Sequence, residues 1–153
     1  MLKNVFFSLL IITGFAFIRS DDNDHYNQKN GVMLDGTDVV SILNNKPCDG
    51  DQKWNAKHNG LTYYFCSEKN KSTFEKNPEK YIPAFGGWCA YALAEEPQKV
   101  SINPENYKVV NGKLLLFYNA WGVNTLEKWN VWNDDQKYFK LAAENWVKLK
   151  AKK

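Results

Sequence analysis

The sequence predicts an α+β domain, in which small antiparallel β-hairpins or one small sheet are flanked by helices and a long C-terminal helix closes the fold. Two Asn-Gly pairs, at 59–60 and 111–112, lie between strand-like segments, and this dipeptide favours the tight turn of a hairpin. Segment 134–149 has the periodicity of an amphipathic helix, with one apolar face: Tyr138, Leu141, Ala142, Trp146 and Leu149. Packing against a core explains that face.

The N-terminus resembles a secretory signal peptide. An apolar run over residues 5–18 follows Lys3, and it is short for a membrane span but long enough for the hydrophobic region of a signal. We expect cleavage near Ser20, which makes residues 1–20 the signal peptide; an uncleaved anchor is the alternative. Residues 21–33 are polar and are expected to form a disordered leader. The folded domain is then 34–153.

Export places the mature chain in the periplasm or outside the cell, without stable membrane insertion after processing. Loss of Lys3 and Arg19 lowers the formal charge from +3 to +1. This balance gives no reason to expect a nucleic-acid partner, and the sequence names no other partner. Three cysteines allow at most one intramolecular disulfide.

The first half of the domain begins with a short helix. Thr37 or Asp38 can cap a helix over 39–43, which Asn44, Asn45 and Pro47 would end. A strand then runs into the first Asn-Gly turn, and residues 61–66 form its partner. Ser67 is a favourable N-cap for a helix that reaches about residue 77, and Pro78 starts a short turn.

The second half repeats this order. The apolar stretch 84–93 contains a Gly pair, which suggests a close backbone approach. Residues 106–110 and 113–118 flank the second Asn-Gly turn, and a helix containing Val123, Leu126 and Trp129 follows. In each half a Phe lies six residues after the turn Asn. We therefore predict two hairpin-then-helix units, with a chance match of turn chemistry as the alternative.

The stretch "GLTYYFCSEKNKSTFEKNPEKYIPAFGGWCAYAL", residues 60–93, resembles the YHS domain, a small module for which metal binding is proposed. The shared features are the G-x-T-Y-Y-F strand, the Cys-Ser at its end, a helix with Phe, and N-P-E-K-Y. With 35–43 and 111–129 included, the chain resembles exported single-domain members of that family. The resemblance implies a family but not an activity, since these exported members have no settled biochemical role.

Two ligands of the metal-binding version are replaced. That version carries C-x3-C, and its second Cys corresponds to Asn70 here; a His on the preceding strand corresponds to Trp54. Only Cys66 is kept. The remaining candidate metal ligands are Cys66, Cys89 and His58. Such a set would suit Cu or Zn, bound weakly, and no cofactor is required.

We therefore expect a non-enzymatic exported protein that binds a metal or small ligand weakly. The alternative is a structural or interaction module without a ligand. A thiol-dependent enzyme comes third: a helix N-terminus would activate Cys66, but only His58 could serve as its base. Four aromatic residues could line a ligand cleft or belong to the core, and the core is favoured: Tyr63, Tyr64, Trp88 and Tyr91.

The sequence also predicts a disulfide between Cys48 and Cys66. Counted from the first Asn-Gly turn, Cys66 faces about Lys53, and a turn at Asp49-Gly50 could bring Cys48 back beside the strand end. Exported relatives usually have an aliphatic residue near 48 and a Ser near 66. Both positions are Cys in this sequence, which favours a disulfide between them over two unrelated thiols. Cys89 is then the free, buried thiol.

Overall fold

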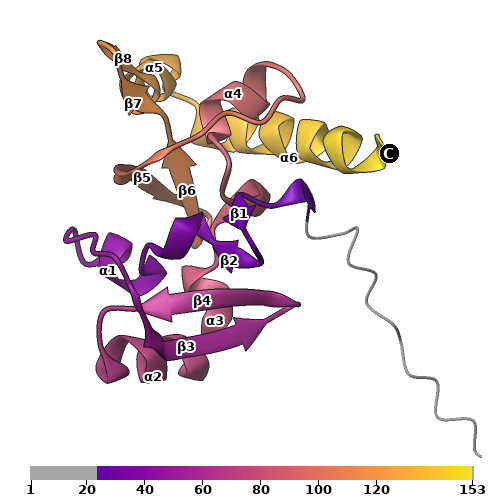
Figure 1. Cartoon of the computed structure of the whole chain (residues 1–153). Coiled ribbons are helices and arrows are strands. Elements are labelled where there is room, and N and C mark those ends of the chain that lie inside the picture. Colours follow the sequence, from indigo (N-terminus) through magenta and orange to yellow (C-terminus); the bar gives the residue numbers. More distant parts are fainter. Residues whose placement is uncertain (1–23, 153) are drawn as a thin grey trace, which may run out of the picture.

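The computed structural model describes residues 24–152, which form an α+β fold as the sequence predicts (Figure 1). The strands are β1 (Gln28–Lys29), β2 (Val32–Met33), β3 (Asp51–His58), β4 (Leu61–Phe65), β5 (Asn103–Val110), β6 (Lys113–Phe117), β7 (Asn119–Ala120) and β8 (Val123–Asn124). The α-helices are α1 (Val39–Leu43), α2 (Glu68–Lys76), α3 (Pro78–Tyr81), α4 (Ala90–Glu95), α5 (Thr125–Trp132) and α6 (Asp135–Ala151), and the 3-10 turns are η2 (Leu34–Gly36) and η3 (Ala84–Gly87). The proposed signal peptide lies outside the described residues.

The two predicted hairpin-then-helix units are present. In the first, β3 and β4 pair antiparallel, β2 lies parallel to β4, and α2 follows; in the second, β5 and β6 pair antiparallel and α5 follows. In Figure 1 the first unit lies below the second, and β6 runs between them.

The hairpins of the two units have the same pairing register. Each pair in the second hairpin lies 52 positions after its counterpart: Asp51 with Phe65 corresponds to Asn103 with Phe117. Both entering strands contain a bulge at the same place, between Asp51 and Asn55 and between Asn103 and Tyr107. A shared irregularity is stronger evidence of a structural repeat than shared turn residues, because a bulge is a specific backbone feature.

A second shared feature precedes each unit's first helix. Three successive residues adopt positive φ in η2, at Leu34, Asp35 and Gly36, and three do so in η3. In the second unit these are Phe85, Gly86 and Gly87. A Cβ on Gly87 would come within 2.9 Å of the Leu34 side chain, so the predicted close approach at the Gly pair is real.

The N-terminal part differs from the disordered leader expected over 21–33. Within the described residues 24–33, β1 pairs with β2, and Met33 is 1% exposed in the core. The indole N–H of Trp88 donates to the carbonyl oxygen of His25 at 2.6 Å, and the N–H of Asn27 donates to that of Gly86 at 2.8 Å. These long-range contacts order a segment whose composition alone favours disorder.

Both predicted Asn-Gly turns are confirmed. Asn59 and Gly60 have φ of 49° and 78°, and Asn111 and Gly112 have φ of 52° and 70°. Positive φ at both central residues is the requirement of a type I′ turn. Two further turns show the same pattern, at 30–31 and 121–122.

The predicted helix caps at α1 and α2 are confirmed, with Asp38 as the cap of α1 and Ser67 as that of α2. Asp134 caps α6 in the same way. The second-unit helix begins later than expected: Asn124 caps α5, and Val123 belongs to the β7–β8 hairpin. No helix among residues 24–152 has the length and apolarity needed to cross a membrane.

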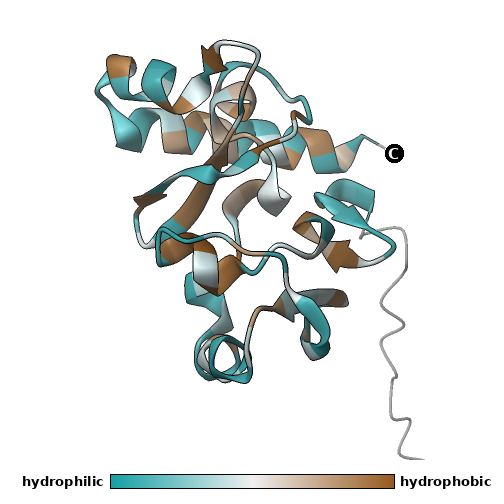
Figure 2. Cartoon of the chain, turned by 60° about the vertical axis from the view of Figure 1, so that its left-hand side comes forward, coloured by the Kyte–Doolittle hydropathy of each residue, from teal (hydrophilic) through white to brown (hydrophobic). Residues whose placement is uncertain are grey.

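Strand β6 separates two hydrophobic cores. Leu114 and Leu116 belong to the first core with β4, α1 and α2, whereas Leu115 and Phe117 belong to the second with α4, α5 and α6. All four side chains are at most 1% exposed. Figure 2 shows hydrophilic and hydrophobic residues alternating along α6, as expected for a helix with one buried face.

Gly112 tests the turn chemistry. A Cβ at this position would meet no atom within 4 Å, so the positive φ of 70° is the only obstacle to a side chain. Replacing Gly112 with Val should lower the free energy of unfolding by about 1 kcal/mol or more, because a β-branched residue resists positive φ. Gly112→Asn should cost much less, since Asn tolerates this region; equal stability of the two variants in urea unfolding would contradict the turn assignment.

Candidate functional site

A disulfide joins Cys48 and Cys66, as predicted, with a Cα–Cα distance of 6.4 Å. Cys48 lies in the segment after α1, and Cys66 lies between β4 and the N-cap of α2. The bond links positions separated by 18 residues, and the chain-entropy model assigns such a loop about 3 kcal/mol. Cys89 is the free cysteine and is buried, also as predicted.

The β3 bulge corrects the register that led to this prediction. Pairing passes from Asn55 with Tyr64 directly to Asp51 with Phe65, so Gln52, Lys53 and Trp54 have no partner on β4. Cys66 therefore faces the segment before β3, and its Sγ lies 3.4 Å from the carbonyl oxygen of Asp49. The bulge brings Cys48 closer to Cys66 than simple counting predicts.

The Asp49-Gly50 pair does not provide the expected turn. Asp49 forms a bridge with Thr37, and the Gly50 N–H donates to the carbonyl oxygen of Gly36 at 2.9 Å. A Cβ on Gly50 would lie 2.6 Å from the backbone nitrogen of Phe65. Gly50 is thus needed because the chain crosses β4 closely here, which holds Cys48 beside the strand end.

The site is built around Asp38, which is 0% exposed. Its Oδ1 accepts the N–H groups of Val40 and Ser41 at 2.8 and 3.1 Å. Its Oδ2 accepts the Cys66 N–H at 2.8 Å and the side-chain amide of Asn70 at 2.7 Å. Four donors match the acceptor capacity of a carboxylate, so Asp38 fixes α1 against the start of α2.

Asn70 takes the place of the second Cys of the metal-binding pattern and has a different role. Its amide group bonds to Asp38 and presents no sulfur to the site. Trp54, at the position of the pattern's His, lies in the β3 bulge with the Lys53 ammonium 3.9 Å from its ring centroid. The N–H of Lys53 donates to Asp51 in the same bulge and lowers the pKa of that carboxyl.

The structure assembles a different ligand set from the one expected. Among the described residues, one group of at least three metal-ligating side chains has its donor atoms within 4.8 Å of one another: Asp38, Cys48 and Cys66. Of the expected ligands, only Cys66 belongs to this group. The sequence alone identifies Asp38 only as a helix cap and Cys48 only as a disulfide partner. The spacing between them gives no metal motif, because the fold brings them together.

His58 and Cys89 lie in other surroundings. His58, at the end of β3, has its Nε2 3.4 Å from Glu79 Oε1 and packs edge-on against Phe74. Cys89 is 0% exposed; its Sγ accepts the Tyr118 N–H at 3.4 Å and contacts the Thr125 hydroxyl at 3.4 Å. Neither residue belongs to the group of Asp38, Cys48 and Cys66.

The second unit contains a counterpart of the site without its chemistry. The Asp38 N–H donates to Cys48, and the Cys89 N–H donates in the same way to Val100, 52 residues after Cys48. Similarly, Asp38 accepts the Cys66 N–H, and Cys89 accepts that of Tyr118, 52 residues after Cys66. The backbone arrangement is repeated, but only the first unit has a carboxylate and a sulfur pair.

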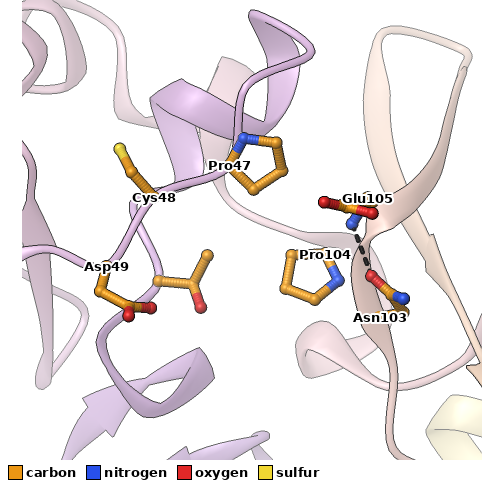
Figure 3. Close-up of a pocket in the computed structure, with 7 residues that line it drawn as sticks. Pro47, Cys48, Asp49, Asn103, Pro104 and Glu105 are labelled. Atoms are coloured by element: carbon orange, nitrogen blue, oxygen red, sulfur yellow. Dashed lines mark hydrogen bonds between the residues drawn. The ribbon is translucent and has the colours of Figure 1, made fainter.

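A pocket of about 370 Å³ opens next to the disulfide, between the two units. Figure 3 shows Pro47 and Pro104 facing across it, with the Cys48 sulfur pointing away from Pro104 and Asn103. The pocket walls include the backbone of the Cys48 segment, but the sulfur is not directed into it. We therefore treat the sulfur and carboxylate group, and not this pocket, as the candidate site.

Three of the four aromatic candidates lie in or against the two cores, whereas Tyr64 is half-buried and belongs to neither. Tyr63 is 3% exposed in the first core, and burial raises the pKa of its phenol. Trp88 and Tyr91 pack against the second core, where Tyr91 stacks on Trp132 with centroids 4.4 Å apart. Tyr63, Trp88 and Tyr91 therefore fit the core interpretation, and Tyr64 does not.

Comparison with known families matches residues 49–84 to the YHS domain, which covers β3, β4, α2 and α3 and confirms the resemblance seen in the sequence. Searches of curated proteins and of solved structures found no match. The matched segment contains Cys66 and Asn70; Asp38 and Cys48 precede it.

Gly50 offers a test of how the site is positioned. Gly50→Ala should lower the free energy of unfolding by more than Gly112→Ala does, because its Cβ would clash with the β4 backbone rather than only strain φ. The displaced Cys48 segment should also slow disulfide formation during refolding. Denaturant unfolding and timed alkylation with mass spectrometry measure the two effects. Equal stability and equal oxidation rates in both variants would contradict the close approach.

Proposed function

We propose, from the premise that residues 49–84 belong to the YHS domain family, that this chain is an exported, non-enzymatic metal-binding protein. Its site is Cys48 and Cys66 in the dithiol form, with Asp38 beside them. The observation that carries the proposal is the gathering of these three side chains within 4.8 Å. Two thiolates favour a thiophilic ion such as Cu(I) or Zn²⁺.

The donor set fits such an ion only after the disulfide is reduced. Metal binding requires a deprotonated thiol, and the two sulfurs of a disulfide are not thiols. The oxidised pair therefore cannot serve as thiolate ligands. The reduced pair supplies two sulfur ligands from different segments, Cys48 before β3 and Cys66 after β4. This pair takes the place of the C-x3-C pair, whose second position is Asn70 here.

The hydrogen bonds of Asp38 limit the affinity. All of its acceptor positions are filled by protein donors, so a metal could use this carboxylate only by displacing one of them. The Asn70 amide is the donor most easily displaced, because it is a side chain rather than backbone. Zn²⁺ would therefore have two protein thiolates and water as its main ligands, fewer than a structural zinc site requires.

Export is supported by two independent features. The first is the signal-like segment at residues 1–20. The second is the disulfide, since such bonds form and persist mainly in oxidising compartments. Together they favour the periplasm or the extracellular space over a reducing cytosol.

The non-enzymatic assignment rests on the surroundings of the thiols. Cys66 is joined to Cys48, and the free Cys89 is buried without a neighbouring base among its hydrogen-bond partners. His58, the base considered for Cys66, lies beside Glu79 and Phe74 instead. A thiol nucleophile needs a base within hydrogen-bond reach.

A structural module without a ligand is the second candidate, and one observation favours it. Asp38 satisfies its four acceptor positions from the protein itself, and the disulfide closes the same site. Under this alternative, the group would serve only to hold α1, β3 and α2 together. The two candidates differ in what the reduced protein does with metal.

Zinc titration separates them. Calorimetry of the oxidised protein should show no specific Zn²⁺ binding, whereas protein reduced with a phosphine and then desalted should bind about one equivalent with a Kd in the micromolar range or weaker. Reduced Cys48→Ser should lose this binding, and Cys89→Ser, which alters the buried thiol, should keep it. Reduced wild type that binds no zinc would favour the structural alternative.

Processing tests the export assignment. Protein recovered from the medium or periplasm should have an intact mass that places its N-terminus within a few residues of Asp21, because the apolar run ends at Ile18. A chain that keeps residues 1–20 and remains in the membrane fraction would indicate an uncleaved anchor.

A further inference from the structure

We propose that Cys48 and Cys66 form a reversible thiol–disulfide switch, and that Asp38 and Ser41 are positioning residues that hold both cysteines in place in either redox state. The output of the switch, release or capture of metal, rests on the proposed function. The redox step itself does not depend on that function.

Three hydrogen bonds fix the two cysteines through their backbones. The Cys66 N–H donates to Asp38 Oδ2 at 2.8 Å, the Asp38 N–H donates to the Cys48 carbonyl oxygen at 3.0 Å, and the Cys48 N–H donates to Ser41 Oγ at 3.1 Å. No sulfur atom takes part in them. Reduction therefore leaves all three bonds intact.

The two positioning side chains are themselves fixed. Asp38 is 0% exposed and Ser41 is 3% exposed. The Ser41 hydroxyl donates to the Asp38 carbonyl oxygen at 2.6 Å, and the Ser41 N–H donates to the Asp38 carboxylate. Asp38 is the N-cap of α1 and Ser41 lies in its first turn, and the apolar side chains of this helix belong to the first core. This frame is thus part of the packed core and not of a loose loop.

The segment carrying Cys48 has further anchors that do not involve sulfur. Asp49 bridges to Thr37, and the Gly50 N–H donates to Gly36. On the other side, β4 leads directly into Cys66 with Phe65 fully buried. After reduction, the two thiols remain close, which gives a high effective concentration for reforming the bond.

The bond can be reached from solvent. Cys48 and Cys66 are both partly exposed, whereas Cys89 is 0% exposed. A thiolate can therefore attack the disulfide without unfolding the core. Exposed disulfides are generally more easily reduced than buried structural ones.

The redox step balances with a thiol reductant such as glutathione. Two glutathione thiols reduce the bond: two electrons and two protons pass to the Cys48 and Cys66 sulfurs, and glutathione disulfide forms. Metal binding by the dithiol then releases the two protons. In reverse, glutathione disulfide accepts two electrons from the metal-bound thiolates and takes up two protons from water to give two glutathione thiols, while the protein bond reforms and the metal leaves.

Equilibration in glutathione buffers tests the switch. Acid quenching, alkylation and mass spectrometry give the ratio of dithiol to disulfide in the full-length mature protein. We expect full reversibility, and hydrogen exchange should show the Cys66 and Ser41 amides protected in both states. Loss of this protection on reduction, or a bond that glutathione cannot reduce in the folded protein, would overturn the proposal and indicate a structural disulfide.

Two variants test the positioning role. Ser41→Ala removes the hydroxyl that accepts the Cys48 N–H and donates to the Asp38 carbonyl oxygen. The covalent bond still holds Cys48 in the disulfide state, but the reduced segment loses this restraint, so the effective concentration of the two thiols and the equilibrium constant for disulfide formation should fall about fivefold. Thr125→Val removes a buried hydroxyl of the second unit and should leave this constant unchanged. Equal constants in Ser41→Ala and wild type would contradict the role of Ser41. Asp38→Asn should have a larger effect if it folds, but the test does not depend on it.

The zinc titration keeps the two proposals apart. A reduced protein that cycles reversibly but binds no zinc would refute metal binding and leave the switch established. A reduced protein that binds zinc but loses amide protection, or does not reoxidise with glutathione disulfide, would refute the switch and support metal binding alone.

Discussion

The fold depends on the burial of both faces of β6. Leu114 and Leu116 complete the core of the first unit, and Leu115 and Phe117 that of the second. A strand with alternating burial can serve one core, but a run of four apolar residues can serve two at once. The units are therefore joined by a shared strand, and the position of β3, β4 and the Cys66 site relative to β5 follows from it.

The two units share a backbone frame but hold different side chains in it. The two units share the hairpin register, the bulge, the left-handed turn before the first helix, and the backbone bonds around residues 38 and 89. Within this shared frame, the side chains around residues 38 and 89 differ. A carboxylate in the first unit accepts four donors, and a thiol occupies the corresponding place in the second. The backbone frame can thus be regarded as a general feature of the fold, with the sulfur pair added to one copy.

Features with local causes could be predicted from the sequence, and features with distant causes could not. The Asn-Gly turns, the Ser67 cap and the C-terminal helix are determined within a few residues, and all are confirmed. The bulge at 52–54 depends on how β3 pairs with β4. It shifts the pairing register of the two strands away from the one obtained by counting back from the Asn59-Gly60 turn. The disulfide was predicted correctly because the direction of that shift brought Cys48 nearer. Asp38 was recognised only as a cap, since its bonds to Cys66 and Asn70 span about 30 residues.

The β7–β8 hairpin has no counterpart in the first unit, where Cys66 is followed directly by the α2 cap. Its base is closed by Thr125, whose N–H and hydroxyl both donate to the Tyr118 carbonyl oxygen, while Trp121 at its tip is 95% exposed. The tip therefore makes little contribution to either core. An affinity tag or a fluorescent reporter could therefore be inserted at this tip without interrupting a helix or strand of either core. The insertion point lies on the second unit, whereas the sulfur pair lies on the first.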